Sequence, residues 1–260
     1  MQFHLLQKQS KFRKYLIGEG VTALSNSFKM KIGIPIISHK RPKIDKCFCL
    51  MVDRLMNDYP GLFLPVCVVS LEEDKAVFEE YGIETHLYKN NPVGEKHNYC
   101  LRLLKDKCSH VFHIGSDDLV DNNYMNELIK FADKDIVWGR GLVFYSVRRK
   151  MARFWEEPFK NFAGPNKLIS ARLLDKLDWH IWDDDIDKGL DHSSSLKLLS
   201  MAESKHIIMI RSIGGLFVDI KGETNINGFE KYINNGREIG IDHLRKRLPA
   251  NEWEYLKSLN

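Results

Sequence analysis

The sequence has no apolar run long enough to cross a membrane. A spanning helix needs about 18 or more apolar residues in succession, and the longest apolar stretch, residues 62–71, is interrupted by Pro65. The first residues also lack the continuous apolar core of a secretion signal, because Lys8 and Lys11 interrupt it. These absences predict a cytoplasmic protein with no transmembrane segment.

Cysteine is scarce, and its spacing excludes the usual cysteine-based sites. The five cysteines are at positions 47, 49, 67, 100 and 108. The pair at 47 and 49 has neither zinc spacing nor a second pair that could complete a site. Because most of the five lie inside apolar runs, we expect reduced thiols that fill core space.

A large excess of positive or negative charge is also missing. Thirty-nine Lys and Arg against thirty-five Asp and Glu give a net charge of +4 and a pI near 8.6. That balance suits an enzyme of anionic substrates but falls short of the pI above about 9 that marks a nucleic-acid-binding domain. The 260 residues are enough for one large domain with a substantial core.

Apolar segments alternate with amphipathic ones between residues 31 and 147. Strands are expected at 31–38, 64–70, 84–88, 110–114 and 135–147, and helices at 43–58, 73–81 and 122–132. Residues 90–98 are expected to form a loop that leads into a helix ending near Lys105. This alternation predicts an α/β fold with a mostly parallel sheet covered by helices on both faces.

The flanking segments follow a different pattern. Residues 1–30 are expected to form a basic helical extension, which would pack on the domain or lie on an anionic membrane, and 226–260 a helical C-terminal segment. The main domain would span 31–225, divided at residue 147. Its second half is expected to contain a helix at 171–177, a helix starting near Asp191, a strand at 206–213 and a loop at 214–228.

Two adjacent carboxylates follow the expected strand at 110–114. Asp117 and Asp118 come after the small residues Gly115 and Ser116, which permit a sharp turn. In an open α/β sheet, ligands bind at the carboxyl ends of the strands. Carboxylates there suit a hard divalent cation, which in turn binds a diphosphate. An ordinary surface turn is the alternative, because Ser-Asp-Asp is common in turns.

Four segments, in order, resemble the GT-A fold of nucleotide-sugar-dependent glycosyltransferases, nearest to the family 2 type. They are residues 32–42 (IGIPIISHKRP), 94–98 (GEKHN), 114–118 (IGSDD), and 164–170 (GPNKLIS) followed by 189–191 (GLD). The sequence departs from that pattern twice. Gly115 stands where the fuller metal motif has its first Asp, and Leu190 stands where a Glu precedes the catalytic Asp.

The resemblance implies a nucleotide-sugar donor and a bound Mn²⁺ or Mg²⁺. Asp118 would be the direct metal ligand, with Asp117 as a second ligand or a contact to the ribose or sugar. Ser38 and Arg41 would contact the nucleotide from the first loop. Glu73, or its neighbour Glu72, would lie against the base, and Lys96 would reach a phosphate.

The resemblance also implies inverting transfer with Asp191 as the general base. Asp184, Asp185 and Asp187 are rivals for that role, and the same acidic segment could be a solvated loop. Asn98 is expected to hold its loop by local hydrogen bonds. Trp155, Trp179 and Trp182 would either stack on the ligand or lie in the core. His192 and Lys221 would contact the diphosphate or serve a structural purpose.

Two other functions stay open. A nucleotidyltransferase of related topology would carry a Gly-rich loop directly after the first strand, but no glycine lies between Ser38 and Pro42. A non-catalytic carbohydrate- or nucleic-acid-binding module could use the basic segments 148–153 and 245–247. The acceptor would be a glycan or a hydroxylated base in nucleic acid.

Overall fold

The computed structural model describes residues 30–156, 164–222, 229–231 and 236–259. Within these residues a seven-stranded sheet, sheet A, has the order β10-β6-β9-β4-β1-β2-β3. Its strands are β1 (Ile32–Ile37), β2 (Phe63–Val69), β3 (Glu84–Leu87), β4 (His110–His113), β6 (Ile136–Arg140), β9 (Lys167–Ser170) and β10 (Lys205–Met209). All run parallel except β9, which is antiparallel to both neighbours. The predicted mostly parallel α/β sheet is therefore confirmed.

A second, five-stranded sheet, sheet B, has the order β12-β8-β7-β11-β5. Its strands are β5 (Asp118–Val120), β7 (Leu142–Ser146), β8 (Met151–Trp155), β11 (Phe217–Lys221) and β12 (Arg237–Ile239). The expected single strand at 135–147 is two strands, because Gly141 turns the chain at φ +95°. The expected loop at 214–228 was wrong over 217–221, where β11 pairs with β7 and β5. Glycines at 214, 215 and 222 flank this strand and gave it the composition of a loop.

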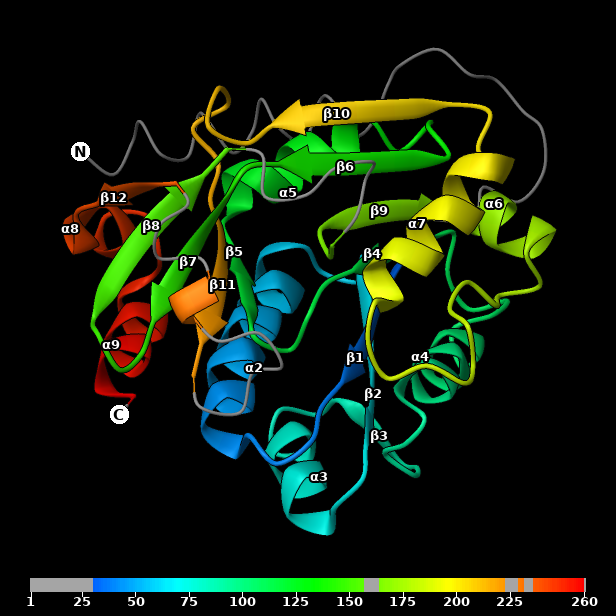
Figure 1. Cartoon of the computed structure of the whole chain (residues 1–260), viewed down its shortest axis with the longest axis horizontal. Helices are drawn as coiled ribbons and strands as arrows, with labels where there is room; N and C mark the ends of the chain where they lie inside the picture. Colours follow the sequence, from blue (N-terminus) through cyan, green and yellow to red (C-terminus); the bar gives the residue numbers. More distant parts are fainter. Residues whose placement is uncertain (1–29, 157–163, 223–228, 232–235, 260) are drawn as a thin grey trace.

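The helices cover both faces of sheet A. They are α2 (Pro42–Asp58), α3 (Glu72–Glu79), α4 (Val93–Arg102), α5 (Asn122–Lys130), α6 (Ala171–Lys176), α7 (Leu190–Met201), α8 (Ile241–Arg245) and α9 (Ala250–Ser258), with a 3-10 turn at Phe229–Lys231. Figure 1 shows α2 between the two sheets, with α4, α6 and α7 grouped on the other side of β4 and β1. None of the helices in the described residues is long and apolar enough to span a membrane.

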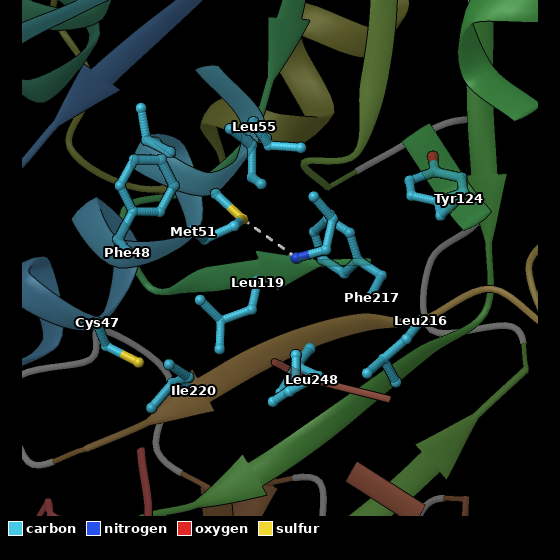
Figure 2. Close-up of a cluster of buried hydrophobic side chains, with 14 of the residues drawn as sticks. Cys47, Phe48, Met51, Leu55, Leu119, Tyr124, Leu216, Phe217, Ile220 and Leu248 are labelled. Carbon is cyan, nitrogen blue, oxygen red and sulfur yellow. Dashed lines mark hydrogen bonds between the residues drawn. The ribbon is translucent and has the colours of Figure 1, made fainter. Parts of the chain in front are cut away.

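The larger core surrounds α2. Pro42 is the first residue of this helix, where its fixed φ favours helix formation. Its buried side chains at 44, 47, 48, 51 and 55 recur at helical spacing and form one apolar face. Figure 2 shows this face packed against β5 and β11, with the sulfur of Met51 accepting a hydrogen bond from the Val120 backbone N–H at 3.2 Å.

A second core lies between sheet A and the helices α4, α6 and α7. Trp179 and Trp182 are fully buried in it, so these two tryptophans belong to the core, one of the two expected roles. The five cysteines form no disulfide, and all but Cys108 are buried, so four of them fill core space as expected. Helices α8 and α9 lie in the predicted helical C-terminal segment, which also contains strand β12 of sheet B. The predicted N-terminal helical extension lies outside the described residues.

Candidate functional site

The two adjacent carboxylates follow β4: Asp117 lies in the turn between β4 and β5, and Asp118 is the first residue of β5. The Gly115 N–H donates a hydrogen bond to Asp118 Oδ2 at 2.7 Å, and the Asp118 side chain is buried. A Cβ at Gly115 would lie 2.7 Å from Asp117 Oδ1 and 2.8 Å from Asp118 Oδ2. A side chain at position 115 would therefore require the Asp117 and Asp118 carboxylates to shift from their present positions.

A third carboxylate, Asp219, lies directly opposite Asp118 in the antiparallel pairing of β11 and β5. One of its oxygens, Oδ2, is 2.8 Å from Lys221 Nζ. The other, Oδ1, is buried and has no hydrogen-bond partner among the described residues. The sequence did not indicate Asp219 as a site residue, because the glycines on either side of its segment favoured a loop. The alternation of apolar Val218 and Ile220 with charged neighbours was the available signal.

Burial and mutual repulsion make Asp118 and Asp219 difficult to ionise. Burial raises the pKa of Asp118 well above its usual range, and the charges of Asp219 and Asp117 raise it further. Burial also raises the pKa of Asp219 to about 6, against the opposing charge of Lys221. A cation placed among the three would relieve this repulsion.

Arg41 connects the first loop to the carboxylate turn. It lies after β1, with its Nη1 atom 3.3 Å from Asp117 Oδ2. Its Nη2 atom donates a hydrogen bond to Ser116 Oγ at 2.7 Å. The carboxyl ends of β1 and β4 thus bring together two of the residues that the sequence indicated as donor-binding.

Buried hydrogen bonds of Ser38 and Lys96 hold the first loop, which follows β1, in place. The Ser38 hydroxyl donates to both oxygens of Asp45, at 2.7 and 2.6 Å. The Lys96 ammonium donates to the Ser38 carbonyl and to Ser70 Oγ, both at 2.8 Å, and is fully buried. Burial lowers the pKa of Lys96 to about 8. In this structure Lys96 therefore joins the ends of β1 and β2, although the sequence suggested a phosphate contact.

The carboxylate that faces the first loop from α3 is Asp74. Glu73 is exposed in the first turn of that helix, whereas Asp74 is buried and its Oδ2 accepts a hydrogen bond from the Lys40 N–H at 2.8 Å. Asp74 Oδ1 and His39 Nδ1 are both buried without hydrogen-bond partners among the described residues. The sequence indicated Glu73 as the acid that contacts the base. In the structure, Asp74 Oδ1 and His39 Nδ1 are the atoms at the first loop that could accept or donate a hydrogen bond to a ligand.

Asp191 lies in the first turn of α7, after Gly189, which adopts the left-handed conformation at φ +75°. Burial raises the pKa of Asp191, Lys167 opposes this effect, and Asp117 adds to it. The candidate base is therefore within electrostatic range of the carboxylate turn. Lys167 is in register with the end of β4, opposite His113. Burial lowers the pKa of Lys167 to about 8.

The acidic segment 183–187 contacts α4 through Asp184 and Asp187 and α7 through Asp183. Asp187 Oδ1 accepts a hydrogen bond from the Val93 N–H at 2.8 Å, Asp184 accepts one from Asn98 at 2.8 Å, and Asp183 is 2.7 Å from Lys197 Nζ. Asp185 is exposed to solvent. Asp183, Asp184 and Asp187 thus stabilise the packing of this segment.

Gly94 and Asn98 fix this segment on the start of α4. The Gly94 N–H donates to the Ile186 carbonyl at 3.0 Å, and a Cβ at Gly94 would overlap the Asp183 carbonyl oxygen. Asn98 Oδ1 accepts from the N–H groups of Ile181 and Trp182 at 3.1 and 3.2 Å. Residues 94–98 (GEKHN) therefore hold residues 181–186, the segment that leads to Asp191, against the start of α4. Asn98 reaches a distant segment, in contrast to the expected local bonds.

The oxygen donors at the turn between β4 and β5 determine which cation it could hold. Within the described residues, no group of three or more His, Cys, Asp or Glu side chains is placed to hold a metal ion. The carboxylates of Asp117, Asp118 and Asp219 are nevertheless hard oxygen donors, and Asp219 Oδ1 is buried without a partner among the described residues. Mg²⁺ and Mn²⁺ need only one or two protein carboxylates, because they keep several positions for water and substrate phosphates.

Comparison with known proteins gives no family. No family model matches the chain, and no curated protein matches it. Among solved structures, one described as the crystal structure of a mycobacterial protein is similar over 56% of this chain, with a TM-score of 0.40 and 10% identity. This chain covers 55% of that protein, about half its length. Similarity at this level does not assign a function.

Proposed function

We propose that this chain is a metal-dependent glycosyltransferase that moves a sugar from a nucleoside-diphosphate sugar to an acceptor hydroxyl, with inversion at the sugar carbon. The observation that carries the proposal is the carboxylate group Asp117, Asp118 and Asp219 at the carboxyl end of β4, with Arg41 at 3.3 Å from Asp117. In sheets of this type, the carboxyl ends of the strands are where ligands bind.

Asp118 and Asp117 would hold Mn²⁺ or Mg²⁺, with Asp219 as a further oxygen donor. When bound, the cation neutralises charge on the diphosphate leaving group. Arg41 and Lys221 already pair with carboxylates of this group, so both are suited to bind phosphate oxygens when the cation takes over those carboxylates.

The first loop would bind the nucleoside. His39 Nδ1 and Asp74 Oδ1 are buried and without partners among the described residues, and leaving such atoms unpaired is costly. A nucleobase or ribose that hydrogen-bonds to them would remove that cost. Ser38 and Lys96 would hold the loop in place by the contacts described above.

Asp191 would accept the proton of the acceptor hydroxyl. As that proton moves to Asp191, the acceptor oxygen forms its bond to the anomeric carbon and the bond from that carbon to the diphosphate oxygen breaks. The raised pKa of Asp191 makes it a stronger base than an exposed aspartate, and Lys167 would stabilise its ionised form before transfer.

The test is a panel of nucleotide sugars and nucleoside diphosphates with Mn²⁺ and with a chelator. We expect one nucleotide to raise the melting temperature only with metal, and its sugar conjugate to release nucleoside diphosphate. Transfer is then assayed with glycan acceptors and with DNA containing a hydroxylated base. The proposal fails if no nucleotide shifts the melting temperature in the presence of metal.

A further inference from the structure

A cavity of about 370 Å³ lies at the start of β11. Phe217, the first residue of β11, lines it, whereas Asp219 is the middle residue of the strand and Lys221 its last. The cavity is bounded by β7, β8 and β12, the turn before β11 and α8, which lie together in Figure 1. Its volume is in the range of about 300–1,000 Å³ that is common for small-molecule sites.

The floor of this cavity is apolar. It consists of the buried side chains of Leu142, Val143, Ile210, Leu216 and Phe217. Phe154 and Ile239 add partly buried apolar walls. Aliphatic side chains thus outnumber aromatic ones, so a ligand body made of aliphatic carbons matches the floor best.

The rim of the cavity is cationic. Arg211, Arg237 and Arg247 line it, and Glu238 is the one acidic residue of the lining. Arg247 pairs with Asp121, but Arg211 and Arg237 have no carboxylate partner among the described residues. The Arg237 guanidinium lies over the Phe154 ring, 5.5 Å from its centroid. Two guanidinium groups are therefore available at the mouth of an apolar cavity.

The titration of a neighbouring histidine agrees with a positive potential at this rim. Burial lowers the pKa of His243, and the charges of Arg247 and Arg237 lower it further. His243 is therefore neutral at physiological pH and can donate or accept a hydrogen bond. Arginine binds phosphate oxygens with a pair of parallel hydrogen bonds.

We infer that this cavity is a second binding site, for a small alkyl phosphate whose chain lies on the apolar floor and whose phosphate binds Arg211 and Arg237. Charge complementarity at the rim and the apolar area of the floor each account for one half of such a ligand. The inference is independent of the proposed function, because none of the carboxylates of the candidate site lines this cavity.

Hexyl phosphate, titrated into the full chain by calorimetry without metal, is the probe. We expect saturable binding, at least about tenfold tighter than for inorganic phosphate or 1-hexanol, since each carries half of the recognised chemistry. Phenyl phosphate distinguishes an aryl from an alkyl preference, and equal or tighter binding of it would overturn the alkyl assignment. Equal binding of inorganic phosphate would overturn the site.

Variants locate the binding. Arg211→Gln with Arg237→Gln should weaken hexyl phosphate binding by about tenfold or more, whereas Arg148→Gln, an exposed arginine outside the lining, should leave it unchanged. Gly240→Trp fills a lining position where a Cβ meets no atom within 4 Å, so it should block binding and keep the fold. Asp118→Asn should not affect hexyl phosphate. Equal loss in Arg148→Gln, or full binding in the double variant, would refute the inference.

Discussion

Replacing Asp118 with asparagine tests whether the Asp118 carboxylate binds a ligand or only stabilises the fold. Asparagine has nearly the same shape, and its amide oxygen can accept the hydrogen bond from Gly115. It removes one negative charge from beside Asp219 and Asp117. Because the folded protein raises the pKa of Asp118, ionisation of that group at neutral pH opposes folding. We therefore expect Asp118→Asn to melt at the same temperature as the wild type or higher, without ligand.

The bound state should respond in the opposite direction. A nucleoside diphosphate with Mn²⁺ at about 100 times its Kd stabilises the wild type by about 2.7 kcal/mol. At about 2–4 °C per kcal/mol for chains near this size, the shift is about 5–11 °C. If Asp118 is a metal ligand, the variant should lose this shift.

Differential scanning fluorimetry of both proteins, with nucleotide alone, metal alone and the two together, measures these effects. Glu73→Gln, which removes an exposed charge from α3, is the matched control and should keep the wild-type melting temperature without ligand. A destabilised Asp118→Asn protein that still shows the full metal-dependent shift would refute the reasoning, since Asp118 would then be structural.

Three further predictions concern the base, a buried acid and the packing of residues 181–186 against α4. Asp191→Asn should bind nucleotide as the wild type does yet lose transfer in the radiolabelled-sugar assay; retained transfer would move the base to residues 183–187. The pKa of Asp45 is raised to about 7, mainly by burial, so its contribution to stability is present below about pH 4 and lost as pH rises through 7. The free energy of unfolding of Asp45→Asn, measured in urea relative to the wild type, should therefore increase by up to about 4 kcal/mol between pH 4 and pH 8. A difference in free energy between the two proteins that does not change with pH would contradict this. Gly94→Ala should lower the free energy of unfolding by about 1–3 kcal/mol by overpacking against Asp183, whereas Gly240→Ala, which has open space, should have little effect, and equal losses would argue against this packing.

The sequence predicted most of the α/β framework because local patterns control it. Apolar runs predicted β1, β2 and β4, and helical spacing of apolar residues predicted α2 within one residue of its bounds. It also indicated that Asp117 and Asp118 follow a buried strand, since chain order alone places them there. The prediction failed at β11, where flanking glycines suggested a loop although the strand is buried between β7 and β5.

Only the tertiary structure decided which side chains meet. Strand pairing places Asp219 opposite Asp118, from residues about a hundred positions apart in the chain. On α3, the side chain of Asp74 points into the protein and that of Glu73 points to solvent. On α4, the side chain of Lys96 is buried and donates a hydrogen bond to the Ser38 carbonyl. Local pattern determines strands and helices, because it acts within a few residues. Register, side-chain direction and burial depend on packing between distant segments, and they determined the composition of the candidate site.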